Sequence, residues 1–269
     1  MIGWDAGHAV DLERPTPLGW LRVVLKFIPC VLTIMLLMIP LALLRALGLW
    51  RTGQRVVCLA CKICLKIIGL PLSIQGKPMQ HTGVVVANHG SWLDILTLNA
   101  CQHVFFVAKS EVKSWPAIGF MARVVGTVFI RRKRVDAKRQ HDLFLDHAKR
   151  GHKLLFFPEG TSTDGCHVLP FRSSLFQAFF ADALINLMWV QPVTVLYTAP
   201  PGKRADFYGW WGEMELVAHM VHLLSQPKQG AVRVIFHPPV RVRDFADRKG
   251  LTKTLYQTVA DGMPSRLPN

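Results

Sequence analysis

Charged residues are scarce in this chain, and acidic residues are the scarcest of them. Lys, Arg, Asp and Glu make up 18% of the sequence, whereas a soluble domain carries about 25%. The 17 acidic residues are outnumbered by 32 basic ones, which leaves a formal charge of +15 and an attraction for anionic partners. Because 51% of the residues are hydrophobic, we expect that partner to be an anionic membrane surface, where each nearby Lys or Arg contributes about 1 kcal/mol.

The motifs of several function classes are missing from the sequence. It has no Cys2His2 spacing, no aromatic RNP-type strand and no basic region joined to heptads, so we expect no nucleic-acid partner. It has no G-x-S-x-G nucleophile elbow, which disfavours a serine hydrolase. It has no P-loop and no G-x-G-x-x-G segment, which disfavours a nucleotide-using enzyme.

The cysteines show no framework of a disulfide-stapled domain. There are six of them, and Cys58, Cys61 and Cys64 recur at every third position. That spacing raises a metal site as an alternative. However, the three lie in an apolar helical stretch without a nearby His or acidic residue, where cysteine packs as a small hydrophobic residue. We therefore expect no metal, and reduced thiols that suit a site facing the cytoplasm.

The first 72 residues divide into an irregular leader, 1–19, and a membrane-associated helical segment, 20–72. The run Phe27–Leu44 contains no charged residue, and as a helix it would rise about 27 Å, just short of a hydrocarbon core of about 30 Å. The next apolar stretch, Val56–Leu72, carries two lysines on one helical face. A helical hairpin lying in one leaflet and a single transmembrane anchor are both compatible with this pattern.

The remainder, 73–269, has the pattern of one α/β domain. Short runs rich in β-branched and aromatic residues alternate with segments of helical periodicity. The runs expected to form strands are 84–88, 103–109, 127–130, 153–158, 188–198 and 231–240. Strands that alternate with helices predict an α/β fold with a mixed, largely parallel sheet flanked by helices.

The segment 88–94, Asn-His-Gly-Ser-Trp-Leu-Asp, joins the first of these strands to a helix, and ligands bind at such strand ends. Ser91 is positioned to cap the helix, with Asp94 three residues later, so the short loop can bring the His89 imidazole to the Asp94 carboxylate. A carboxylate on one ring nitrogen fixes the tautomer, and the other nitrogen can then act as a general base. Taken alone, however, the spacing is more typical of a capped helix beside a solvated loop histidine.

The segment 156–165 also follows a strand. Its turn contains Glu159, Gly160 and Thr161. Backbone N–H groups around Gly160 and Thr161 could bind an anion or a developing oxyanion. Glu159 could accept from hydroxyls or orient an arginine. By itself this segment is more typical of a turn with a capping acid.

Two further strands carry notable residues at or near their ends. The strand 127–130 is followed by Arg131, whose fork-shaped guanidinium suits a phosphate or carboxylate. In 190–197, Pro192 interrupts a strand. The simpler interpretations are a solvated charge run for the first and an edge-strand proline for the second.

Together, and in this order, the four segments resemble the glycerolipid and lysophospholipid acyltransferase family, which includes 1-acylglycerol-3-phosphate and lyso-ornithine lipid acyltransferases. The resemblance covers roughly residues 75–200. The residues that carry it are Asn88, His89 and Asp94; Phe129 and Arg131; Pro158, Glu159, Gly160 and Thr161; and Pro192. Each segment alone is weak evidence, whereas the ordered set is strong.

This resemblance implies an O-acyltransferase with no cofactor besides its acyl donor. His89 would be the general base, oriented by Asp94, and the acceptor hydroxyl would attack the thioester of acyl-carrier protein or coenzyme A directly. Arg131 and the turn 159–161 would hold the head of a lysolipid, in the first place 1-acylglycerol-3-phosphate. The implied location is a bacterial inner membrane, with the site facing the cytoplasm. A non-catalytic membrane adaptor is the alternative from another class, but it leaves the histidine and aspartate unexplained.

The sequence departs from the phosphate-using members of the family at one position. They often carry an arginine after Glu-Gly-Thr, where this chain has Ser162. The residues that follow resemble members that acylate lyso-ornithine lipid, which is therefore the alternative acceptor, and Arg172 is the candidate anion partner. The segment 207–216 also resembles that subgroup. Its simpler interpretation is an amphipathic stretch with Trp210 and Trp211 at the level of the lipid headgroups.

Overall fold

The computed structural model describes residues 4–8, 12–115, 118–130 and 137–264. Within these ranges the α-helices are α1 (Pro17–Ala46), α2 (Trp50–Ile68), α3 (Leu93–Cys101), α4 (Ile118–Val124), α5 (Ala137–Lys149), α6 (Asp182–Ile185), α7 (Leu216–Ser225) and α8 (Arg248–Asp261). The strands are β1 (Leu72–Gln75), β2 (Gly83–Ala87), β3 (Phe105–Lys109), β4 (Val128–Ile130), β5 (Lys153–Phe156), β6 (Trp189–Thr198), β7 (Ala231–Phe236) and β8 (Val240–Arg241). Short 3-10 helices are η1 (Ser110–Ser114), η3 (Ser173–Phe180) and η4 (Val242–Asp244).

The strands form one mixed sheet in the order β1-β7-β6-β2-β5-β3-β4, with β8 pairing with β6. From β6 to β4 every neighbouring pair is parallel. Only β7 and β8 run antiparallel to β6, and β1 lies parallel to β7 at the edge. The predicted mixed, largely parallel α/β sheet is therefore confirmed.

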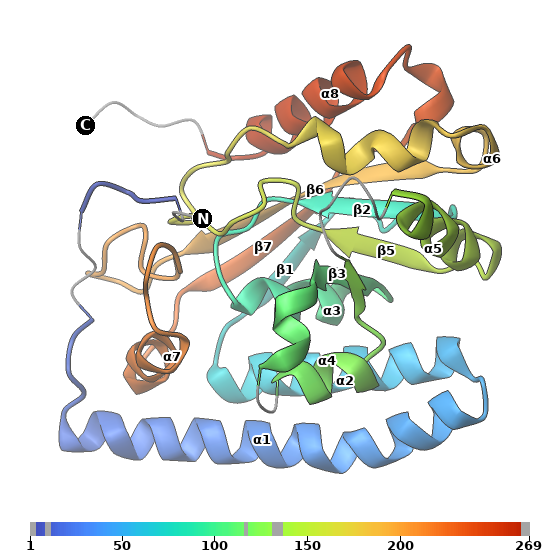
Figure 1. The fold of residues 1–269 in the computed structure, drawn as a ribbon. Coiled ribbons are helices and arrows are strands. Elements are labelled where there is room, and N and C mark those ends of the chain that lie inside the picture. The colour runs from blue at the N-terminus through green and yellow to red at the C-terminus, as the bar shows by residue number, and fades with distance from the viewer. Residues whose placement is uncertain (1–3, 9–11, 116–117, 131–136, 265–269) are drawn as a thin grey trace.

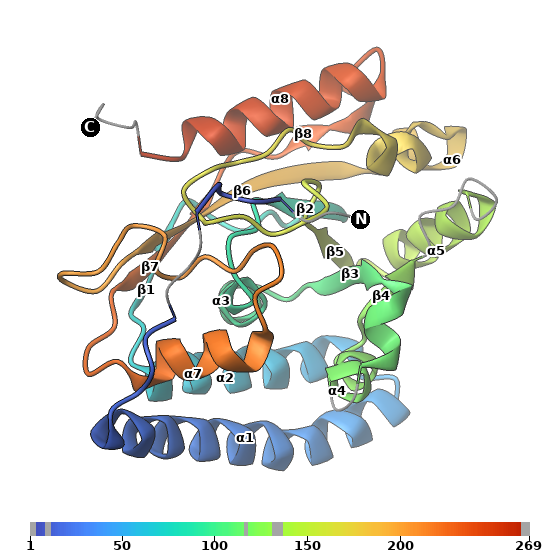
Figure 2. The same cartoon turned by 60° about the vertical axis from the view of Figure 1, so that its left-hand side comes forward.

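Helices cover both faces of the sheet, as Figures 1 and 2 show. Strand β2 is buried at every position because its side chains alternate between two apolar layers. Val85 and Ala87 pack with residues of α1, α2, α3 and α7. Val84 and Val86 pack with residues of α5, η3, α6 and α8. This double burial accounts for the continuous apolar run that leads into the segment 88–94.

The N-terminal helices form a hairpin whose two arms run antiparallel. Cys30 of α1 lies against Cys64 of α2, with each sulfur within 3.9 Å of the other residue's carbonyl oxygen. Farther along α1, Leu41 lies beside Gly53 near the start of α2. The hairpin ends at Ile68, and β1 begins at Leu72, so the expected helical segment 20–72 is observed as 17–68.

Helix α1 is the one described helix that is long and apolar enough to cross a membrane. It lies along α2 and α7 (Figure 2), and near its start the Lys26 ammonium donates to the Gln226 carbonyl, 3.0 Å away. Its outer face has no partner within the described part of the chain. Met35, Leu36 and Ile39, for example, are 63–67% exposed. Four exposed basic residues follow one another along the neighbouring helix α2, namely Arg51, Arg55, Lys62 and Lys66.

The segment 207–216 is not an interfacial amphipathic stretch. Its first nine residues form turns and loops, and α7 begins at Leu216. Trp211 is buried beneath Trp4 and His8 of the N-terminal leader, at ring distances of 6.1 and 5.7 Å. The bulky aromatic side chain therefore completes the protein interior rather than reaching lipid headgroups. The leader is irregular over residues 4–8 and 12–16, whereas the last three residues of the expected leader, 17–19, belong to α1.

Candidate active site

The candidate site lies where β2 and β5 end side by side. The two strands are parallel neighbours, so the segment 88–94 and the turn after Phe156 leave the same edge of the sheet. Asn88 fixes the first of these segments to β6. Its amide donates to the carbonyl of Val195 at 3.0 Å and accepts from the N–H of Val195 at 2.7 Å. The buried Asn88 side chain thus anchors the segment 88–94 to the sheet.

His89 and Asp94 are in contact. The Nδ1 of His89 lies 2.8 Å from the Oδ2 of Asp94. The carboxylate is fully buried, whereas the imidazole is 18% exposed. Because Nδ1 faces Asp94, Nε2 lies on the far side of the ring, as proton transfer to an acceptor requires.

The Asp94 carboxylate is held from several sides. Its Oδ2 also accepts from the N–H groups of Gly90 and Ser91, at 2.9 and 3.0 Å. Its Oδ1 accepts from the hydroxyl of Tyr197 at 2.8 Å. Asp94 lies in the first turn of α3, where the partial positive charge of the helix N-terminus stabilises a carboxylate. These donors offset the cost of burying the charge and fix the orientation of the carboxylate.

Ser91 does not cap the helix as the spacing predicts. Helix α3 begins at Leu93, and its N-cap residue, Trp92, makes no side-chain capping bond. The Ser91 hydroxyl accepts only a long bond, 3.4 Å, from the N–H of Leu93. Asp94 acts in its place, because its carboxylate accepts from the backbone N–H groups of Gly90 and Ser91 that precede the helix. Ser91 therefore contributes through its backbone N–H.

The imidazole of His89 is held by stacking. It lies on the ring of Phe157, with centroids 3.9 Å apart and planes 7° apart. The backbone of His89 is fixed as well, because its carbonyl accepts from the N–H of Thr163 at 2.8 Å. Phe157 therefore positions the imidazole face while Asp94 positions its edge. Nothing in the spacing of the His-Asp segment alone indicated this stacking partner.

Glu159 braces the site from within. It is 2% exposed. Its two carboxylate oxygens accept from the N–H groups of His89 and Leu169, each at 2.7 Å. Burial raises its pKa to about 8, and the negative charges of Asp94 and Asp164 add to the rise. Because both oxygens are occupied by backbone amides, the geometry favours a bracing role over the expected contact with substrate.

The rest of the turn also differs from the expected anion cradle. Gly160 has a φ of +83°, and its N–H donates within the turn to the carbonyl of Phe157 at 3.2 Å. That N–H is therefore not directed at a ligand. The Thr161 hydroxyl lies 3.4 Å from the carbonyl of Ser162. Arg172 is exposed, and its Nε donates to the carbonyl of Glu159 at 3.1 Å, so its guanidinium borders the turn.

The remaining predicted residues occupy three different places. Arg131 lies outside the described residues, after Phe129 of the edge strand β4, whose partner in β3 is Ala108. Pro158 is buried and its carbonyl accepts from the N–H of Arg172 at 3.0 Å. Pro192 is not in an edge strand. It lies in β6, opposite Val86 of β2 and inside the sheet.

Two loops, around Gly165 and around Trp210, pack against the segment that carries His89. The motif spacing did not indicate these contacts. The N–H of Trp210 donates to the carbonyl of Gly90 at 2.9 Å. A Cβ at Gly90 would come within 2.7 Å of the Cα of Gly165, and one at Gly209 within 2.5 Å of the Asp164 carbonyl oxygen. Such distances require glycine, because no side chain fits between the backbones. Glycines in the loops are thus the one sequence signal that could have revealed this packing.

Comparison with known proteins identifies the family of this chain. The sequence model of the family described as Acyltransferase matches residues 72–195. A lyso-ornithine lipid O-acyltransferase of Rhodobacter capsulatus is 54% identical over 206 residues, which cover 77% of this chain and 75% of that protein. This chain belongs to the acyltransferase family. It is therefore an enzyme, and the alternative of a non-catalytic adaptor is set aside.

Other relatives of this acyltransferase carry a different name. A 1-acyl-sn-glycerol-3-phosphate acyltransferase of Neisseria meningitidis is 43% identical over 139 residues, covering 51% of this chain and 52% of that protein. The crystal structure of the 1-acyl-sn-glycerophosphate acyltransferase of Thermotoga maritima matches with a TM-score of 0.67 at 20% identity. That match covers 93% of this chain and 98% of that one. The structural likeness establishes a common fold.

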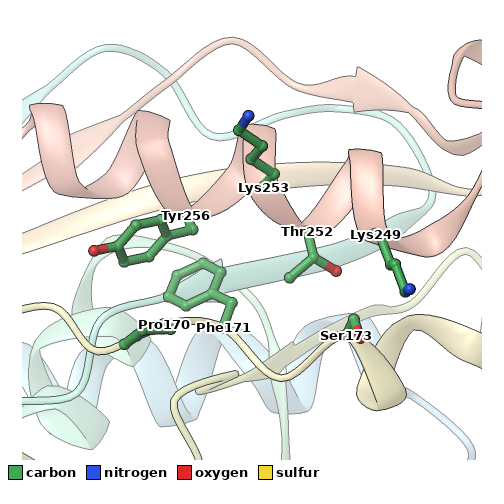
Figure 3. Close-up of a pocket in the computed structure, with 7 residues that line it drawn as sticks. All are labelled: Pro170, Phe171, Ser173, Lys249, Thr252, Lys253 and Tyr256. Carbon is green, nitrogen blue, oxygen red and sulfur yellow. The ribbon is translucent and has the colours of Figure 1, made fainter.

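The acyltransferase also has a shallow groove beside α8. Figure 3 shows Phe171 and Tyr256 at its base, with Lys249 and Lys253 on α8. Neither His89 nor Asp94 lines it. The groove is therefore distinct from the His-Asp site, although Arg172, which borders the Glu159 turn, follows Phe171 directly in sequence.

Proposed function

We propose that this acyltransferase moves a fatty acyl group from a thioester to the free hydroxyl of a lysolipid, with His89 as general base. The observation that carries the proposal is the 2.8 Å contact between a partly exposed imidazole and a fully buried carboxylate. The buried Asp94 holds one ring nitrogen, and the other is available to an acceptor hydroxyl. General-base help of this kind contributes about 10²- to 10⁴-fold in rate.

The proposed reaction is a single acyl transfer without an acyl-enzyme. The acceptor oxygen forms a bond to the thioester carbonyl carbon while its proton passes to Nε2 of His89. The tetrahedral intermediate then collapses, the carbon–sulfur bond breaks, and the thiolate leaves with the electron pair. The imidazolium of His89 returns the proton to the thiolate, so the products are an ester and a free thiol, and His89 is regenerated.

We favour lyso-ornithine lipid as the acceptor, ahead of 1-acylglycerol-3-phosphate. The relative that is 54% identical bears the lyso-ornithine lipid name, whereas the 43% identical one is named for the glycerol phosphate. Ser162 stands where phosphate-using members often carry an arginine. The exposed guanidinium of Arg172 beside the Glu159 turn is suited to a carboxylate head.

The acyl donor in this proposal is acyl-carrier protein or acyl-coenzyme A, and no metal or other cofactor takes part. The enzyme works on the cytoplasmic face of a bacterial inner membrane. The exposed apolar face of α1 supports contact with lipid, and the exposed basic residues along α2 support an anionic surface. Held in this way, the enzyme would meet an acceptor that is itself part of the membrane.

The test is acyl transfer by the purified chain in detergent or vesicles. A radiolabelled acyl thioester is offered with lyso-ornithine lipid or with 1-acylglycerol-3-phosphate, and labelled product is counted. We expect a higher kcat/KM on lyso-ornithine lipid, and a loss of at least about 100-fold on both acceptors in His89→Ala. Equal turnover in that variant would overturn the role of His89. A preference for the phosphate acceptor would overturn the proposed head group and leave the reaction intact.

A further inference from the structure

We propose that Tyr197 is a positioning residue that holds the His89–Asp94 pair from the opposite side of the carboxylate. Its hydroxyl lies 2.8 Å from Oδ1 of Asp94, the oxygen that neither His89 nor the loop amides occupy. This inference rests on the proposed general-base role of His89. Tyr197 lies two residues beyond the stretch 72–195 that the family model matches.

The fold delivers Tyr197 to this place by strand alternation. Val193 and Val195 of β6 face the layer that contains α3, and Tyr197 follows them with the same period of two. Thr97 lies one turn after Asp94 on α3, and its hydroxyl is 3.4 Å from that of Tyr197. Because a carboxylate only accepts, the phenol gives its single proton to Asp94, and Thr97 donates in turn to the phenol oxygen.

This hydrogen bond matters to the basicity of His89. A hydrogen bond to Oδ1 draws charge away from the carboxylate and so limits how strongly Asp94 stabilises a protonated imidazole. Without the bond, the Asp94 carboxylate directs more negative charge at Nδ1 of His89 and stabilises the imidazolium form more strongly relative to the neutral base. Burial and the charge of Asp94 raise the pKa of Tyr197 well above its ordinary value, so the phenol stays protonated across the working range.

Several other ionisable groups surround the pair and must be held constant. Glu159 accepts from the His89 amide, and Asp164 lies near Glu159 with His167 on its outer side. On α7, His219 accepts from the Trp92 indole, and burial lowers the pKa of His219 to about 4. The ring of Tyr208 lies beside that of Tyr197, tilted by 35° and with the centroids 5.3 Å apart.

Tyr208 provides a matched control for the test. It is buried, and its hydroxyl donates to Gln229 and accepts from the N–H of Gly230, so it does not touch Asp94. Tyr197→Phe and Tyr208→Phe therefore remove the same atom from neighbouring rings, one at the pair and one away from it. Circular dichroism and thermal unfolding are to be measured first, to check that both variants fold.

The experiment is the pH profile of kcat/KM for acyl transfer by wild type and the two variants. In Tyr197→Phe we expect the acidic limb to move up by about half to one pH unit, with a loss of up to about three- to tenfold near neutral pH. In Tyr208→Phe we expect the limb to stay in place, even if the whole profile is lower because of lost stability.

A coincident acidic limb in wild type and Tyr197→Phe would overturn the inference, whatever the overall rate. So would an equal displacement in Tyr208→Phe, which would indicate a general disturbance of the core. His89→Ala separates this outcome from failure of the proposed function. If that variant is inactive and the Tyr197→Phe profile is unmoved, the general base stands and the positioning role of Tyr197 is wrong.

Discussion

The loop that carries His89 and the outer face of α1 are built in opposite ways. In the loop, the carboxylate of Asp94 receives four donors, and the amides of His89, Gly90 and Ser91 all have partners inside the protein. On α1, the large apolar side chains of the outer face are exposed, with Leu36 the most exposed of them at 67%. In the loop, the polar groups find their hydrogen-bond partners inside the protein. On the outer face of α1, the apolar side chains have no packing partner among the described residues.

This difference distinguishes a site whose polar groups are paired within the protein from an apolar surface that is available for an interaction. Buried polar groups must be paired within the protein, because an unpaired one costs about 1–3 kcal/mol. A continuous exposed apolar surface instead marks an interaction site. Substitutions in the loop should therefore act on turnover, and substitutions on α1 should act on membrane binding. Both regions should respond independently, because they lie on different layers of the molecule (Figure 1).

The largest effect is expected from Asp94→Asn, which breaks the completed loop. The neutral amide lacks the negative charge that stabilises a protonated imidazole, and its NH2 group must replace either the oxygen that faces Nδ1 of His89 or the oxygen that accepts from Tyr197, so the tautomer of His89 is no longer fixed. We expect kcat/KM for acyl transfer to fall by about 10²- to 10⁴-fold.

A second His-Asp contact offers the matched control for this variant. The Nδ1 of His167 lies 2.6 Å from Oδ2 of Asp164, beside the catalytic loop. Asp164→Asn keeps an oxygen for the amides of Cys166 and His167 and should cost less than about tenfold in kcat/KM. Similar losses in the two variants would show that the 89–94 pair has no special role.

The next largest effect is expected on membrane binding, from a substitution on the outer face of α1. Leu36→Asp places a charge on the exposed side of α1 and should weaken binding to anionic vesicles by about 30- to 100-fold. Stability should change by less than about 0.5 kcal/mol, because the Leu36 side chain is 67% exposed over the described residues. Sedimentation with vesicles measures the binding, and Leu187→Asp, a 49% exposed position after α6, is the control. Unchanged sedimentation of Leu36→Asp would remove the outer face of α1 from the membrane contact.

Glu159→Gln tests the brace under the loop through the pH dependence of stability. The folded protein holds a proton on Glu159 up to pH about 8, whereas an ordinary glutamate releases it near 4.5. The free energy of unfolding in wild type should therefore fall as pH rises from about 4.5 to 8, by up to about 1.4 kcal/mol per pH unit. The variant should lack this slope.

Glu159→Gln should also be less stable at acidic pH, by about 1–3 kcal/mol, because its NH2 group opposes one of the two backbone donors. Glu13→Gln is the control, since Glu13 pairs with Lys203 at an exposed site and should change stability by less than about 1 kcal/mol. Urea unfolding at several pH values measures both. Parallel curves for wild type and Glu159→Gln would contradict the protonation of Glu159 in the fold.

The smallest effect is expected from Arg172→Ala. Arg172 is exposed but borders the Glu159 turn. Removing a contact made in both ground and transition states should raise the KM for the lysolipid by about three- to tenfold, with kcat nearly unchanged. Arg248→Ala, at a half-buried arginine at the start of α8 that donates to Gln177, should leave the KM unchanged. An equal rise of KM in both variants would point to general loss of positive charge.

Local pattern was sufficient for much of the fold. The continuous apolar run of β2 and the helical spacing after it predicted the strand, loop and helix that carry the His-Asp pair. The sequence pattern was ambiguous at two positions, and there the predictions were wrong. Leu72 was placed in the helical segment, but it begins β1 beside β7. The simpler interpretation of Pro192, an edge-strand proline, is wrong: Pro192 pairs with Val86 of β2 inside the sheet, and β8 and β7 pair with the residues of β6 before and after it.

The sequence by itself determined the reaction class, because the ordered motifs place an imidazole and a carboxylate within one short loop. It also determined the apolar and basic character of the N-terminal helices. Only the tertiary structure decided which groups meet that pair. Tyr197 lies in β6, 103 residues after Asp94, and Glu159 lies in the turn after β5, 65 residues after Asp94. Contacts at such separation depend on strand order and register, which spacing along the chain does not record.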